Sequence, residues 1–174
     1  MKRQAGPSKI VLMLLIFTGI IMNAAVTGAD YNKATVLIGY LSGDHLTPKP
    51  ITGAQGEIEF KLSDDGRELY YKLSVANAEH ATAAYIYLAP DGENGRAIVT
   101  LFDLKEFPRS GSFDGEVAEG IITADKLIGP LVGSSLSSLF REMGDGNTYV
   151  NVLTEDYPQG YIRGRIVDPV SFGK

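Results

Sequence analysis

Two tyrosines two positions apart, Tyr85 and Tyr87, are the first residues whose types and spacing suggest a chemical role. They lie in the alternating stretch TAAYIYL, and side chains two apart in a strand point to the same side. Near the other end of the chain, Tyr161 and Arg163 have the same spacing in the stretch GYIRGR. Aromatic faces beside a guanidinium suit stacking on a sugar or a peptide, or holding a carboxylate. These residue types are therefore suited to binding a ligand rather than to catalysis.

Residue types that catalysis needs are scarce in this sequence. There is no cysteine, which removes thiolate zinc sites, iron–sulfur clusters and a cysteine nucleophile. With His45 and His80 alone, a three-histidine metal site cannot be built. Gly133-Ser134 is not part of a G-x-S-x-G elbow, and no glycine motif of the phosphate-binding kind is present. We therefore expect no enzymatic activity, no cofactor and no metal site.

The turn PDGENG after the tyrosine strand invites a calcium interpretation, with Asp91, Glu93 and Asn94 as oxygen donors. It lacks the spacing and the bidentate glutamate of an EF-hand loop. Turns use Asp, Asn and Gly for their backbone angles, so an ordinary turn is the preferred interpretation.

The first 29 residues have the pattern of an export signal. Three basic residues precede the apolar stretch IVLMLLIFTGII, and Thr27 and Ala29 suit the −3 and −1 positions of a cleavage site. The apolar run is shorter than the roughly 20 residues of a spanning helix, but extending it to Val26 leaves an uncleaved membrane anchor as the alternative. In either case we expect residues 30–174 to lie outside the cytoplasm.

The net charge of the chain limits the classes of ligand that it can bind. The net charge is −5, and removing residues 1–29, which hold three basic and no acidic residues, makes it −8. Nucleic acid and anionic lipid both need a basic patch, and no Lys/Arg cluster is present. We expect a protein, carbohydrate or small-molecule ligand and no nucleic acid.

The residues after the signal read as short strands separated by turns, within one domain of residues 30–174. In EIEFKLSDDGRELYYKLSV, alternating apolar residues predict a hairpin whose turn contains Asp65-Gly66. The stretch SSLSSLFREMG has apolar residues at helical spacing and predicts one short helix, capped by Ser134 or Ser135 and ending at Gly144. Because no βαβ alternation occurs, we expect an all-β, antiparallel Greek-key β-sandwich with an immunoglobulin-like arrangement of about seven to eight strands in two sheets.

Four longer motifs follow one another along this domain: LSGDHLTPKPITGAQGEIEFKLSDDG, TAAYIYLAPDGENG, GIITADKLIGPL and GNTYVNVLTEDYPQGYIRGRI. Together they resemble the CHRD domain, a family named from repeats in the developmental regulator chordin and widespread in secreted microbial proteins. The resemblance runs from about Thr35 to Ile166. It implies an exported β-sandwich similar in outline to copper/zinc superoxide dismutase, with no established catalytic activity.

The chain departs from the family pattern at four positions. Tyr85 and Tyr87 stand where the family has His-Ile-His, Leu153 where it has Val-His-Thr, and Tyr161 where it has Gly-Glu-Ile-Arg-Gly. Three histidines and a carboxylate, residue types that ligate metals, are thus replaced together. If these family positions cluster in space, the resemblance implies that a polar pocket has become aromatic here.

Two interpretations of these residues remain open from the sequence. In the first, they form a ligand-binding surface or shallow pocket, whose members would be Tyr85, Tyr87, Asn151, Leu153, Tyr161 and Arg163. In the second, the tyrosines only fill the inner layer of the sandwich, since aromatic residues in strands usually serve packing.

The predicted function is that of an exported, non-enzymatic CHRD-like domain that acts by binding at the cell surface or outside the cell. One alternative is a metal-binding or redox domain of the superoxide dismutase type, with a site that is degenerate or rebuilt from carboxylates. A further alternative is a structural component of the cell envelope.

Overall fold

A computed structural model describes residues 36–90, 92–104 and 112–170 of the chain. All of them belong to the second of the two units into which the chain divides, residues 34–174. Eight β-strands make up most of it: β1 (Val36–Ser42), β2 (Gln55–Leu62), β3 (Leu69–Glu79), β4 (Ala81–Leu88), β5 (Arg96–Asp103), β6 (Ser112–Ile122), β7 (Thr148–Thr154) and β8 (Ile162–Arg165).

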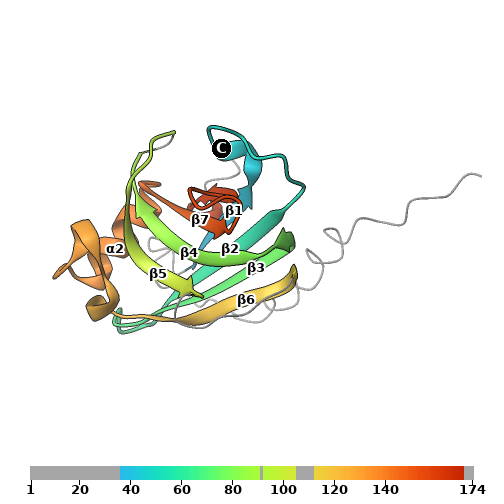
Figure 1. Ribbon diagram of the computed structural model, residues 1–174. Helices are drawn as coiled ribbons and strands as arrows, with labels where there is room; N and C mark the ends of the chain where they lie inside the picture. The colour runs from blue at the N-terminus through green and yellow to red at the C-terminus, as the bar shows by residue number, and fades with distance from the viewer. Residues whose placement is uncertain (1–35, 91, 105–111, 171–174) are drawn as a thin grey trace, which may run out of the picture. The chain divides into compact units, whose positions relative to one another are not determined.

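All eight strands form one antiparallel sheet in the order β5-β4-β7-β8-β1-β2-β3-β6. The sheet curls on itself, and its two edge strands, β5 and β6, face each other across an opening (Figure 1). The all-β class and the strand number agree with the sequence pattern. The two expected sheets are joined into one, because β8 bonds to β1 and connects the halves. Connections from β3 to β4, from β5 to β6 and from β6 to β7 cross between strands that are not neighbours.

The predicted hairpin is confirmed as β2 and β3, which pair from Gln55 opposite Ala76 to Leu62 opposite Leu69. The Ser63 N–H donates a hydrogen bond of 2.9 Å to the Glu68 carbonyl and closes the connection between the two strands. The connection is therefore longer than a two-residue turn. Gly66 has a φ of +68°, a backbone angle that favours glycine at this turn.

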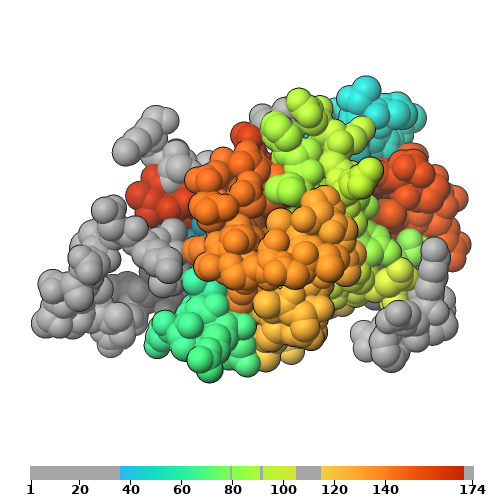
Figure 2. Space-filling view, turned by 90° about the vertical axis from the view of Figure 1, so that its left-hand side faces the viewer, coloured from blue at the N-terminus to red at the C-terminus, as the bar shows by residue number. Residues whose placement is uncertain are grey.

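The predicted helix is also confirmed. It is α2 (Leu136–Gly144), and the Ser135 hydroxyl caps it by accepting a hydrogen bond from the Ser138 N–H. Short 3-10 turns η1 (Gly43–His45), η2 (Ala124–Lys126) and η3 (Gly129–Leu131) complete the described elements. In the space-filling view the segment with α2, in orange, crosses the side of the domain that also carries the β2–β3 turn in green (Figure 2). Among the described residues, no helix has the length and apolar composition needed to cross a membrane.

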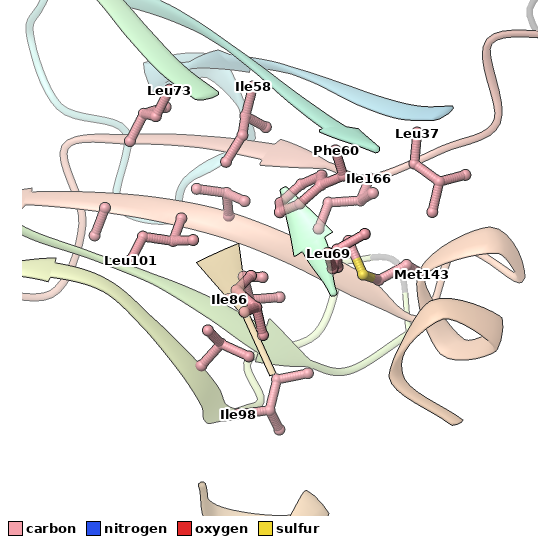
Figure 3. Packing of buried hydrophobic residues seen from close by; sticks show 14 of the residues in the cluster. Leu37, Ile58, Phe60, Leu69, Leu73, Ile86, Ile98, Leu101, Met143 and Ile166 are labelled. Atoms are coloured by element: carbon pink, nitrogen blue, oxygen red, sulfur yellow. The ribbon is translucent and has the colours of Figure 1, made fainter. Parts of the chain in front are cut away.

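The inner face of the curled sheet holds the hydrophobic core. Alternate residues of β4, β7 and β8 contribute to it, and α2 adds the apolar face that the helical spacing predicts. Burying each large aliphatic side chain stabilises the fold by about 1.5–3 kcal/mol. Figure 3 shows members of this cluster from the sheet and from α2, among them Leu37, Ile58, Phe60, Leu69, Leu73, Ile86, Ile98, Leu101, Met143 and Ile166.

A groove of about 710 Å³ lies between the two edge strands of the sheet. Tyr71 of β3 spans part of it, because its hydroxyl donates a hydrogen bond of 2.6 Å to the Leu101 carbonyl of β5. Burial raises the pKa of the Tyr71 hydroxyl, so the group is a neutral donor at physiological pH. This contact links β3, the neighbour of the edge strand β6, to the other edge strand, β5, without a strand pair.

Candidate ligand-binding site on the outer face of β4, β7 and β8

Strand alternation places Tyr85 and Tyr87 on the outer face of β4. Ala84 and Ile86, which lie between and beside them, are fully buried in the core cluster, and neither tyrosine belongs to that cluster. Both tyrosine side chains are half-buried. The outward direction is what a recognition surface requires.

The strand register lines up the other candidate residues in rows across this outer face. Tyr85 lies opposite Asn151 of β7, and Asn151 lies opposite Arg163 of β8. In the next row, Tyr87 lies opposite Tyr149, which in turn lies opposite Arg165. Residues 76 positions apart in the chain, such as Tyr87 and Arg163, are therefore near neighbours across the sheet.

Three side chains form a stack on this face. The rings of Tyr87 and Tyr149 are parallel within 4°, with centroids 5.1 Å apart, and the guanidinium carbon of Arg163 lies 3.5 Å from the Tyr149 centroid. Tyr85 adds an edge contact to Tyr87 at 6.1 Å. Aromatic pairs and desolvated cation–π contacts each contribute about 0.5–2 kcal/mol, so the stack holds its own geometry. Burial, and secondarily the neighbouring Tyr149, raise the pKa of Tyr87 and keep its phenol neutral.

Arg163 also fastens the β4–β5 turn over this face. Its guanidinium donates to the Asn94 side-chain oxygen at 3.0 Å and to the Glu93 carbonyl. The Tyr149 hydroxyl accepts a hydrogen bond of 3.1 Å from the Gly95 N–H. Arg163 of β8 and Tyr149 of β7, the two members of the cation–π pair, thus both form hydrogen bonds to the β4–β5 turn.

These bonds bear on the calcium interpretation of the same turn. The Asn94 side-chain oxygen, one of the expected calcium donors, already accepts a hydrogen bond from the Arg163 guanidinium, as does the backbone carbonyl of Glu93. Asp91 lies outside the described residues. Among the residues that the structure describes, no group of three or more His, Cys, Asp or Glu side chains could hold a metal ion.

Asn151 is buried on β7, opposite Tyr85 of β4 and beside the turn that follows β7. Its side-chain nitrogen donates to the Gln159 carbonyl at 3.0 Å, and its Oδ1 has no hydrogen-bond partner in the described part of the chain. Gly160 lies against this amide so closely that a Cβ there would be 2.7 Å from Oδ1. Asn151 therefore holds the β7–β8 turn in place.

Leu153 and Tyr161 lie at the far end of the same face. Leu153 is partly buried opposite Ala83, and the Tyr161 N–H donates to the Val152 carbonyl, which extends the β7–β8 ladder. The Tyr161 ring packs against the core cluster, and its hydroxyl accepts a 2.6 Å hydrogen bond from the Thr52 hydroxyl. Tyr161 is thus held by the core cluster and by Thr52.

A groove of about 460 Å³ lies beside the stack, between the β4–β5 turn and strands β1 and β8. His45 is at its border, and because its Nδ1 lies 2.9 Å from the Arg163 carbonyl, this ring nitrogen carries the proton. Sequence reasoning missed most of the lining, since it depends on β1 lying next to β8. The groove is lined by Tyr40, His45, Ala89, Pro90, Gly92, Thr148, Tyr149, Arg163, Arg165 and Val167.

One comparison with known proteins gives a match. The family model of the CHRD domain matches residues 39–166, which run from β1 to the end of β8 and include the whole outer-face site. No curated protein and no solved structure matches the chain significantly.

Proposed function

The chain belongs to the CHRD domain family, and from this premise we propose that its domain is a non-catalytic binding module that acts outside the cytoplasm. The family match and the all-β fold support the module itself. Its mode of action and its location are the parts that we propose.

One observation carries the binding role: the stack of Tyr87, Tyr149 and Arg163 stands beside an open groove. Aromatic faces next to a fixed cation favour the ring of a sugar or a planar peptide group. Backbone and side-chain bonds from Asn94 and Gly95 hold these groups before any ligand arrives. Such preorganisation lowers the entropic cost of binding.

The location is proposed from the first 29 residues. A positive start, an apolar stretch and small residues at the −3 and −1 positions favour cleavage after Ala29. We expect the exported protein to begin at Asp30, which N-terminal sequencing of material recovered outside the cytoplasm of a bacterial host measures. An intact Met1 in that fraction would favour the membrane anchor, and retention of the whole product in the cytoplasm would contradict export.

The binding role is tested with the double variant Tyr85→Ala/Tyr87→Ala of the full chain. Saturation-transfer NMR against a panel of neutral and acidic sugars and N-acetylated tripeptides, each at about 1 mM, detects affinities in the weak range. We expect at least one probe to bind the natural chain and to lose its signal with the double variant. Tyr70→Ala is the matched control, because Tyr70 is exposed on β3, away from the site.

Three outcomes would contradict the proposed function. They are a panel without a binder, a binder that the double variant retains, and stoichiometric copper or zinc in the purified chain. The last result would support the metal-handling alternative. Thermal melting of each variant accompanies the binding data, so that loss of the fold is not mistaken for loss of the site.

A further inference from the structure

Arg163 is a buried cation whose partners are neutral. Its side chain is only 8% exposed, and its guanidinium contacts an amide oxygen, a backbone carbonyl and the face of Tyr149. Within the described part of the chain, no carboxylate forms an ion pair with it. Buried charges in proteins are usually paired, because removing a charge from water costs several kcal/mol. An anionic ligand would therefore stabilise the buried Arg163 side chain.

The groove beside Arg163 has the electrostatic character that an anion requires. Among the described residues that line it are Arg163, Arg165 and His45, and none of these described residues is a carboxylate, although the chain as a whole has a net charge of −5. Arg165 is exposed, and its Nε donates to the Gly146 carbonyl at 2.8 Å, which fixes the side chain along the groove. Cationic side chains are thus gathered at this place on an acidic protein.

The remaining walls suit an organic body rather than a bare inorganic ion. Ala89, Pro90 and Val167 are apolar, and Tyr40 and Tyr149 add ring surface. A volume of about 460 Å³ is within the range of small-molecule sites. A planar carboxylate is the anion that a guanidinium holds best, through two parallel hydrogen bonds.

We propose that this groove binds the carboxylate of a small organic acid, with Arg163 and Arg165 facing the charge and the apolar walls contacting the rest of the molecule. This inference rests on the proposed binding function and specifies its ligand chemistry. Two sources share that chemistry: an acidic sugar unit of a polysaccharide, and the free C-terminus of a peptide.

Calorimetric titration of the full chain tests the charge requirement with paired probes. Galacturonate is compared with galactose, and an N-acetylated tripeptide with its C-terminal amide. We expect at least one acid to bind ten-fold or more tightly than its neutral counterpart, and the acid that binds identifies the source. Inorganic phosphate is the third probe, and we expect it to bind more weakly than that acid because it cannot use the apolar walls.

Variants then locate the binding without endangering the fold. We expect Arg165→Gln to weaken binding of the acid ten-fold or more. Arg67→Gln is the control. Arg67 lies at the β2–β3 turn, away from the groove, and its substitution removes the same charge from the chain. Equal weakening by Arg165→Gln and Arg67→Gln, or no weakening by either, would overturn the inference.

The two proposals fail in different ways. Neutral probes that bind as tightly as the acids, with binding lost in the Tyr85→Ala/Tyr87→Ala variant, would overturn the carboxylate inference and leave the binding module standing. Phosphate that binds as tightly as the acids would likewise overturn the choice of an organic acid. Absence of any binder would overturn both proposals.

Discussion

Replacing Gly164 with alanine is expected to destabilise the domain by about 3 kcal/mol or more, at the upper end of the cost of overpacking. A Cβ at this position would lie 2.2 Å from the Tyr40 carbonyl oxygen and 2.6 Å from its carbon. These are backbone atoms of β1, so no side-chain rotation relieves the clash. The strand itself would have to move.

The effect is large because β1 and β8 join the two halves of the sheet. The described contacts of this join are the pair Ser42–Arg163 and the isolated bridge between Ile38 and Val167. Gly39 approaches from the other side, where a Cβ would lie 3.0 Å from the Arg165 carbonyl. Separating the strands would also displace the two arginines of the groove.

Denaturant unfolding of Gly164→Ala measures this effect. Gly53→Ala is the matched control, since no atom lies within 4 Å of a Cβ built there, and we expect a change within about 0.5 kcal/mol. Equal stability of the two variants would show that β8 does not pack on β1 in this way.

The second large effect is expected for Tyr149→Ala, at about 3 kcal/mol, near the lower end for deleting a buried aromatic side chain. Tyr149 is 5% exposed, and three contacts depend on its side chain. Its ring makes the stack on Tyr87 and the cation–π contact with Arg163, and its hydroxyl accepts the hydrogen bond from the Gly95 N–H. Its loss also leaves the Arg163 charge without its aromatic partner.

Tyr149→Phe separates these contributions, because it keeps the ring and removes only the hydroxyl. We expect a loss of about 1 kcal/mol, the usual net value of one hydrogen bond. Tyr70→Ala, at an exposed aromatic of β3, is expected to cost well below the Tyr149→Ala value. Chemical denaturation compares the three, and a Tyr149→Ala change no greater than that of Tyr70→Ala would contradict the stack as an energetic unit.

Local sequence pattern was sufficient for the elements whose partners are close in the chain. Alternation and a turn with Gly66 identify the β2–β3 hairpin, and the spacing from Leu136 to Met143 identifies α2. The same alternation places Tyr85 and Tyr87 on one face. It does not say which face, because Ala83 and Ala84, on opposite sides of β4, are both apolar and both buried.

The site needed information that no local pattern contains. His45 and Arg163 are 118 positions apart and meet only because β8 lies beside β1. Arg163 and Asn94 are 69 positions apart and meet because β7 pairs with β4. For the same reason the expected pair of sheets is one curled sheet, since the pair between Ser42 and Arg163 and the bridge between Ile38 and Val167 join them. Alternation sets the faces of a strand, whereas the neighbours of that strand are set by the packing of the whole domain.

The most direct test of the outer-face site is the amide correlation NMR spectrum of the isotope-labelled full chain, recorded during titration with the probe that binds most tightly. A ligand at the outer-face site is expected to concentrate the shifts at the β4–β5 turn, at Thr148–Asn151 and at Arg163–Arg165. Shifts concentrated on β2, β3 and β6, or spread evenly over the domain, would contradict this expectation.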